Sequence, residues 1–187
     1  MNLKFRPLKA SEIDVRIQSA TEKGCILLLY KDARCDMNIL DETVGPMGWK
    51  REHTRENANC IVSIWDVDKE QWVSKEDTGT ESNTEKEKGQ ASDSFKRACF
   101  NWGIGRELYT SPFIWVNAKD CNLYSVKANG KEIWKCNDKF EVAKIIIDEN
   151  KTITALYIIN SKTKKGVFTL MPPKEGVKSV SYTHLRA

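Results

Sequence analysis

Two neighbouring cations, Lys96 and Arg97, lie in the middle of a long amphipathic segment, and an aromatic residue, Phe100, follows within one helical turn. At about 100° per residue, all three fall on the side of a helix opposite an apolar stripe. The stripe consists of Ala91, Phe95, Ala98, Cys99 and Trp102. Cations neutralise phosphates and aromatic rings stack on bases, so the polar side has the composition of a nucleic-acid surface. The alternative is that Phe100 packs against a second core layer or a neighbouring subunit.

Further basic residues extend this predicted surface. Lys86 belongs to the same side of the helix, and Arg51 and Arg55 are expected on one side of a preceding strand, because they are four residues apart. Each contact with a phosphate would strengthen binding at low salt without distinguishing one base sequence from another. Together these side chains predict a groove that follows a nucleic-acid backbone.

The helix that carries these residues is predicted to begin at 82–84 and to end at Trp102. Thr84 and Glu87 have the spacing of a capping box, and Gly103 suits the first position after the helix. The Gly-Ile-Gly sequence at this point closes a helix, whereas a phosphate-binding loop follows a strand and opens a helix. We therefore expect no nucleotide cofactor.

Residues for bond-breaking chemistry are sparse in this sequence. Asp66 and Asp68 are close enough for a metal-dependent nuclease, but they flank a predicted tight turn, where acidic residues are common. The six cysteines include no C-x-x-C spacing, and His53 is the only histidine before residue 184. We expect no catalytic residues, no metal site and hence no enzyme, with a nuclease as the third hypothesis.

The fold class predicted from the pattern of apolar residues is α+β. Three antiparallel strands, at 49–56, 60–67 and 71–75, precede the long helix, and a turn at 57–59 joins the first two. The apolar stripe of the helix must pack against something, most simply these strands. The sequence thus predicts a β-β-β-α core unit, a three-stranded sheet packed on a long helix.

Three elements are expected before this unit. Ser11 and Asp14 have the spacing of a capping box, and Ile13 and Ile17 are four residues apart, as on one side of a helix. Together they predict a short helix at 11–19. An apolar run at 25–30 predicts a buried strand, and helical spacing continues from 32 to 44 before Gly45.

The C-terminal third is predicted to form a further β meander. Its expected strands lie at 113–116, 131–134, 140–147, 152–159 and 167–170. An Asn129-Gly130 turn of the hairpin type precedes the second of these. We expect one domain over 1–175, with a core at 20–116 and a β extension at 117–175. The tail at 176–187 continues no pattern and is a candidate non-native end.

Bulk composition sets limits on the class of protein. The 187 residues are 40% hydrophobic and 30% charged, which is typical of a single globular domain. The net charge is −2 over residues 1–116 and +6 over 117–187, so the C-terminal third suits a polyanionic or acidic partner. No apolar run reaches the length of a membrane span and no secretory signal is evident, so we expect a cytoplasmic protein without a membrane partner.

One long stretch resembles a known family. Residues 75–109 read K-E-D-T-G-x-E-S-x-T-E-K-E-K-G-Q-A-S-D-S-F-K-R-A-x-x-N-W-G-I-G-R-E-L-Y, with further similarity in L-D-E-T-V-G-P-M-G-W-K-R-E at 40–52 and N-A-N-C-I-V-S-I-W-D at 57–66. This stretch resembles the prokaryotic and phage single-strand annealing proteins of the DdrA and Sak type, which are relatives of the eukaryotic Rad fifty-two annealing protein. The resemblance covers about two thirds of the chain well.

The resemblance implies roles for individual residues. The Lys96-Arg97 pair would line a positively charged groove for single-stranded DNA, and Lys88 matches another basic position of the family. The eukaryotic relatives carry an arginine where this chain has Phe100, so stacking would partly replace charge there. Arg106, after the glycines, is a candidate to compensate for that missing cation.

The resemblance also implies a function and partners. It implies a DNA-recombination and repair protein that binds single-stranded DNA and anneals complementary strands without a cofactor. A homo-oligomeric ring with DNA wound around its outside is expected, and a phage exonuclease or a host single-strand binding protein is a candidate partner. The leading alternative is a DNA-end-binding protection factor or scaffold that does not anneal.

Overall fold

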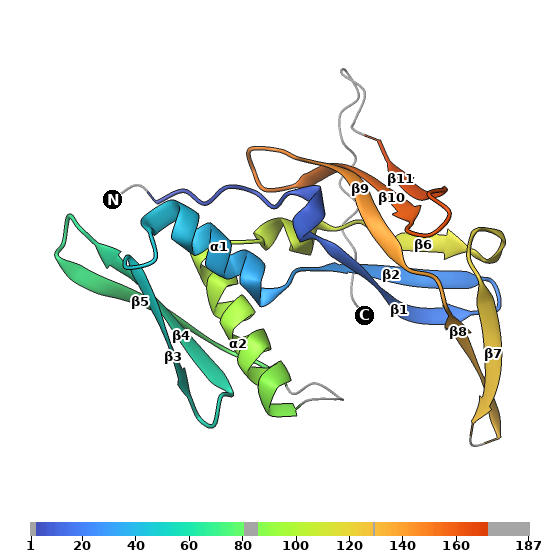
Figure 1. Cartoon of the computed structure of the whole chain (residues 1–187), viewed down its shortest axis with the longest axis horizontal. Coiled ribbons are helices and arrows are strands. Elements are labelled where there is room, and N and C mark those ends of the chain that lie inside the picture. Colours follow the sequence, from blue (N-terminus) through green and yellow to red (C-terminus); the bar gives the residue numbers. More distant parts are fainter. Residues whose placement is uncertain (1–2, 81–85, 129, 172–187) are drawn as a thin grey trace, which may run out of the picture.

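The computed structural model describes residues 3–80, 86–128 and 130–171. Within these residues the chain is α+β, with two α-helices and three antiparallel sheets of six, three and two strands (Figure 1). The helices are α1 (Ala33–Val44) and α2 (Lys86–Trp102). The three-stranded sheet lies at one end of the molecule and the two-stranded hairpin at the other, with the six-stranded sheet between the helices and the hairpin.

The largest sheet joins both ends of the described chain. Its strand order is β11-β10-β9-β1-β2-β6, so β9 pairs with β1 although more than a hundred residues separate them in sequence. The strands are β1 (Asp14–Thr21), β2 (Gly24–Tyr30), β6 (Ile114–Asn117), β9 (Phe140–Ile147), β10 (Ile153–Asn160) and β11 (Gly166–Leu170). The predicted strands at 25–30, 113–116, 140–147, 152–159 and 167–170 are therefore present within one or two residues.

The helix predicted at 11–19 is wrong. Only a 3₁₀ turn forms there, at Ala10–Glu12, and β1 follows it. Ile13 and Ile17 are four residues apart, which places them on one side of a helix but also on one side of a strand, because four is a multiple of the strand period. Ile17 lies opposite Leu27 of β2, and this pairing decides the conformation.

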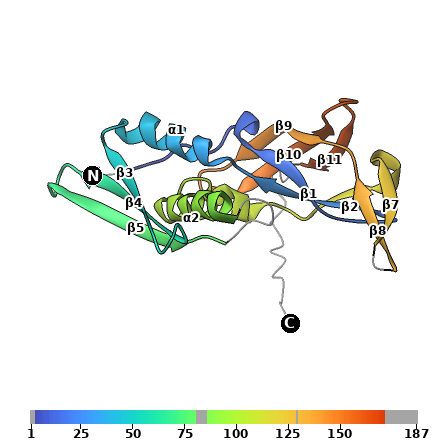
Figure 2. The same ribbon diagram turned by 60° about the horizontal axis from the view of Figure 1, so that its bottom comes forward.

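The three-stranded sheet runs in the order β3-β4-β5 and packs against α2. Its strands are β3 (Trp49–Thr54), β4 (Asn59–Asp66) and β5 (Gln71–Thr78). Phe95, Ala98 and Cys99 of α2 are fully buried, as are Cys60 and Val62 of β4. The predicted apolar stripe thus packs on the sheet, and Figure 2 shows α2 lying beside β3–β5. The predicted helix start at 82–84 lies outside the described residues.

The remaining elements differ from prediction at their edges. The turn between β3 and β4 spans residues 55–58, so Asn59 belongs to β4 rather than to the turn. Helix α1 begins after Asp32, whose carboxylate accepts the Arg34 N–H at 2.8 Å, and ends at Val44, directly before Gly45, as predicted. The hairpin of β7 (Leu123–Ala128) and β8 (Lys131–Cys136) contains one strand that the sequence analysis did not predict, and residue 129 of its turn lies outside the described part.

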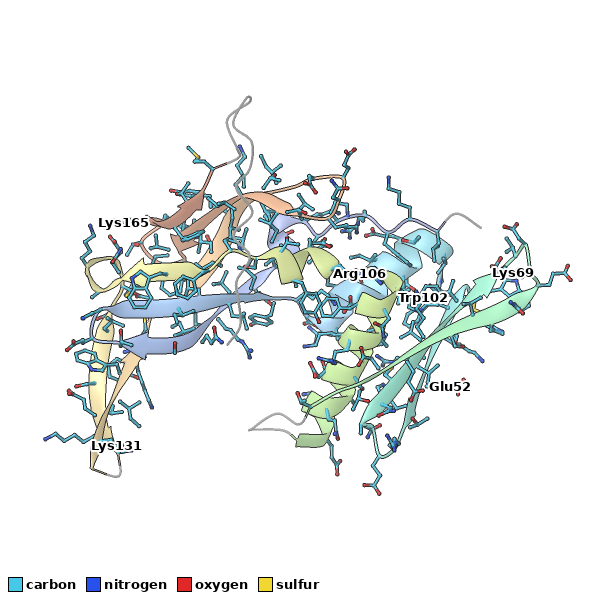
Figure 3. All side chains as sticks on the ribbon, turned by 180° about the vertical axis from the view of Figure 1, so that it is seen from behind. Glu52, Lys69, Trp102, Arg106, Lys131 and Lys165 are labelled. Atoms are coloured by element: carbon cyan, nitrogen blue, oxygen red, sulfur yellow. The ribbon has the colours of Figure 1, made fainter. Side chains whose placement is uncertain are left out.

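Trp102 fastens the end of α2 to the sheet, and its removal should destabilise the fold. Its indole N–H donates to the Val62 carbonyl at 3.0 Å, and the Lys75 ammonium lies 4.7 Å from the centre of its ring (Figure 3). Trp102→Ala is expected to lower the free energy of unfolding by about 3 kcal/mol, at the lower end for an aromatic residue because Trp102 is only partly buried. Urea denaturation checks this value; Trp102→Phe should cost less, and an unchanged midpoint for both variants would contradict the packing role.

Candidate nucleic-acid interface

A groove lies between the end of β2 and the side of α2 that faces away from the three-stranded sheet. We call it the β2–α2 groove; it has a volume of about 320 Å³. It is lined by Arg16, Leu28, Leu29, Tyr30, Lys31, Asp93, Lys96, Phe100, Leu108 and Tyr109. Sites for small organic groups usually begin at roughly this size. Its walls therefore bring together three aromatic rings and three cationic side chains.

The aromatic residues of the groove present rings to solvent. Phe100 and Tyr109 meet edge to face, with ring centres 5.0 Å apart, and Tyr109 is 70% exposed. Tyr30, at the end of β2, is 39% exposed, and the Arg16 guanidinium lies 6.0 Å from the centre of its ring. Burial raises the pKa of Tyr30 above its ordinary value. An exposed ring beside a cation is the arrangement that stacks a base and contacts its phosphate.

The floor of the groove is a buried ion pair. Lys31 and Asp36 are both buried, and the Lys31 ammonium donates to the Asp36 carboxylate. The same ammonium lies 4.5 Å from the centre of the Phe100 ring, so Phe100 covers the pair. Desolvation raises the pKa of Asp36 to about 6 despite the nearby cation. Gly105, at φ +72°, gives the Lys31 stem its space, because a Cβ there would lie 2.3 Å from the Lys31 Cε.

The predicted Lys96-Arg97 pair is divided between two surroundings. Lys96 lines the β2–α2 groove, whereas the Arg97 Nε lies 3.3 Å from an Asp77 carboxylate oxygen on β5. Asp93 also lines the groove and accepts the Thr80 N–H at 3.0 Å, so it partly offsets the positive charge of Lys96. The Arg97 side chain is 44% exposed but does not line the groove, so Lys96 is the member of the pair that shares the groove with the aromatic rings.

Arg106 caps the helix rather than extending the groove. Its guanidinium donates to the carbonyls of Phe100 and Asn101 at 2.6 and 2.8 Å, where α2 ends (Figure 3). Carbonyls at the end of a helix lack the usual amide donor four residues later; that of Phe100 accepts the Gly103 N–H at 2.9 Å and that of Asn101 the Lys75 ammonium at 2.7 Å. A cation there also suits the negative end of the helix dipole. Its predicted role in replacing a DNA-binding arginine therefore competes with this structural role.

Of the other predicted cations whose side chains the structure describes, Arg51, Arg55 and Lys88 do not line the groove. Arg55 lies in the turn after β3 at φ 52°, so the prediction that it shares one side of a strand with Arg51 is wrong. The Arg51 guanidinium lies 4.9 Å from the centre of the buried Phe95 ring, on the side of β3 that faces α2. Lys88 is exposed on the first turns of α2. Lys86 begins α2, and its side chain is outside the described part of the structure.

Four cationic or aromatic residues of the groove were missed by the sequence analysis: Arg16, Tyr30, Lys31 and Tyr109. Arg16 was hidden because its segment was predicted to be helical, and Tyr30 because it ended an apolar strand. Tyr109 lies within the stretch that resembles annealing proteins, yet nothing in its spacing distinguishes it from a core residue. An aromatic residue directly after a buried strand was the one signal that could have identified Tyr30.

The chain matches no protein-family model, no characterised protein and no solved structure. Neither described α-helix has the length and apolar character needed to cross a membrane.

Proposed function

We propose that this protein binds single-stranded DNA in the β2–α2 groove and anneals complementary strands during phage or bacterial recombination and repair. The observation that carries the proposal is the combination of exposed Tyr30 and Tyr109 with Arg16 and Lys96 around one groove. The resemblance of residues 75–109 to annealing proteins supports it independently, because Lys96, Phe100 and Tyr109 lie inside that stretch.

The groove residues would divide the task between charge and stacking. Arg16 and Lys96 would neutralise phosphates, while Tyr109 and Tyr30 would hold bases by stacking, which tolerates every base. Annealing breaks no covalent bond; it requires two strands held extended with their mutual repulsion reduced. The reaction therefore needs neither a catalytic residue nor a nucleotide or metal cofactor.

In this proposal, β3–β5 and α2 act as the β-β-β-α unit of an annealing protein, and copies of the chain assemble into a ring. Each groove covers only a short length of strand, so a ring would join successive grooves into a continuous track. A phage exonuclease or a host single-strand binding protein would deliver the DNA, in the cytoplasm.

The second candidate is a DNA-end-binding protection factor that holds one strand without annealing it. The internal pairing of Arg97 with Asp77 and the presence of Asp93 in the groove favour it, because both reduce the charge available for a second strand. A nuclease is less well supported, since an Asp66 oxygen accepts the Asp68 N–H at 3.0 Å within a turn.

The annealing rate of two complementary oligonucleotides tests the proposal. In magnesium-free buffer the protein is expected to accelerate duplex formation, and the gain should decline between about 50 and 200 mM salt because phosphate contacts are lost. Binding without acceleration would favour the protection factor. Absence of binding to single strands would contradict both functions.

A further inference from the structure

Three cysteines from distant parts of the sequence meet at the far end of the six-stranded sheet. The sulfur atoms of Cys25, Cys121 and Cys136 all lie within 4.8 Å of one another. Cys25 belongs to β2, Cys121 follows the 3₁₀ turn at Ala118–Asp120, and Cys136 ends β8. Their separation in sequence produces no metal-binding motif, which is why spacing alone predicts no site here.

The separation of the sulfur atoms suits a single metal ion. Zinc binds thiolate sulfur at about 2.3 Å in a tetrahedron, which places neighbouring sulfur atoms roughly 3.8 Å apart. Cys25 is fully buried, whereas Cys121 and Cys136 are half-buried. The cluster is therefore closed on the side of β2 and open enough on the other side for an ion to enter.

A carboxylate lies beside the cluster, next to Cys136, and is the candidate for a fourth ligand. An oxygen of Asp138 lies 4.0 Å from the Cys136 sulfur, two residues after the end of β8. The same oxygen accepts the Asn122 N–H at 2.6 Å, which fixes the carboxylate beside the residue that follows Cys121. Carboxylates complete zinc sites, and a hydrogen bond to such a ligand holds its orientation.

We propose that Cys25, Cys121, Cys136 and Asp138 form a structural site for a thiophilic divalent cation, with Zn²⁺ as the ion that fits best. Three thiolates favour a soft metal over magnesium or calcium, and a closed set of four ligands is typical of structural rather than catalytic zinc. The site is distant in the fold from the β2–α2 groove and does not depend on DNA binding.

The site would attach the β7–β8 hairpin to the large sheet. Cys25 lies on β2 opposite Val116 of β6, whereas Cys121 and Cys136 flank the base of the hairpin, whose other end is marked by Lys131 (Figure 3). The Cys121 thiol donates to the Asn117 carbonyl at 3.3 Å. Metal binding would replace this weak contact by bonds that join three segments.

The test is a zinc titration of the full chain, reduced and stripped with a chelator, against a chromogenic competitor. We expect about one equivalent of Zn²⁺ to bind and to raise the melting temperature, and Cd²⁺ to produce the ultraviolet absorption of metal thiolates. Cys121→Ser with Cys136→Ser should remove both effects. Asp138→Asn should weaken zinc binding at least about 10-fold, because it removes the charge of a direct ligand and even the loss of a ligand's hydrogen-bond partner typically costs about 10- to 100-fold.

The control is Cys60→Ala, which removes a thiol as buried as that of Cys25 from the three-stranded sheet and should leave zinc binding unchanged. Equal zinc binding by wild type and the Cys121/Cys136 double variant would overturn the proposal. A disulfide between two of the three cysteines in protein alkylated at lysis would also overturn it. Should the double variant fail to fold, the wild-type titration and Asp138→Asn still decide the question.

Discussion

Tyr109→Ala is expected to weaken binding of single-stranded DNA about 5- to 150-fold without changing its salt dependence. The ring is 70% exposed and contacts Phe100 edge to face, so its face is open to a base. One base–aromatic stack contributes about 1–3 kcal/mol, which corresponds to this range of affinity. Because stacking releases no counterions, the slope of affinity against salt should stay as in wild type.

Lys96→Ala tests how much charge, as distinct from stacking, contributes to the affinity for single-stranded DNA. Loss of one phosphate contact should reduce the salt slope for a single strand by about 0.7 and weaken binding most at low salt. Fluorescence anisotropy with a labelled oligonucleotide at four salt concentrations measures both quantities. The two variants should thus fail in different ways, which a general loss of folding would not produce.

The controls for this pair are Tyr124→Ala and Lys69→Ala. Tyr124 lies on β7 and is 38% exposed, and Lys69 is an exposed cation in the turn between β4 and β5. Both should bind DNA as wild type does. If Tyr109→Ala and Lys96→Ala also bind normally, while their circular dichroism is native, the β2–α2 groove is not the DNA site.

An element of this fold could be predicted from the sequence where the contacts that determine it join residues close together in the chain. The stripe of α2 was predictable because Phe95, Ala98 and Cys99 repeat at helical spacing and the strands that cover them precede the helix directly. Strand β1 was not predictable, because the spacing of Ile13 and Ile17 fits both a helix and a strand. The residue that lies opposite Ile17, Leu27, belongs to β2.

The candidate sites were less predictable than the elements that carry them. Lys96 and Phe100 were identified from one helix, but Arg16 and Tyr30 reach the same groove only through the pairing of β1 with β2. The cysteine cluster is a stronger case, because the pairing of β7 with β8 and the attachment of that hairpin bring together residues more than ninety positions apart. Spacing rules detect sites built from one segment and miss sites built by topology.

The buried ion pair beneath Phe100 should matter more for stability than any exposed pair in the described structure. Lys31→Met is expected to lower the free energy of unfolding by about 3–5 kcal/mol, because it leaves the Asp36 carboxylate buried without its cation. Replacing both partners, as Lys31→Met with Asp36→Leu, should recover most of this loss. Lys50→Met, which removes an exposed partner of Glu52, should change stability by less than about 1 kcal/mol.

The loss in Lys31→Met should also depend on pH. The pKa of Asp36 in the folded wild type is raised to about 6, so its contribution to stability is fully present below its unfolded pKa of about 3.9 and is lost as pH rises through 6. Without Lys31 the folded pKa rises further, because desolvation is then unopposed by that cation. The difference in unfolding free energy between variant and wild type should therefore widen from pH 5 to pH 8. Urea denaturation at both values measures it, and a difference that is constant or shrinks with rising pH would contradict a buried charge at Asp36.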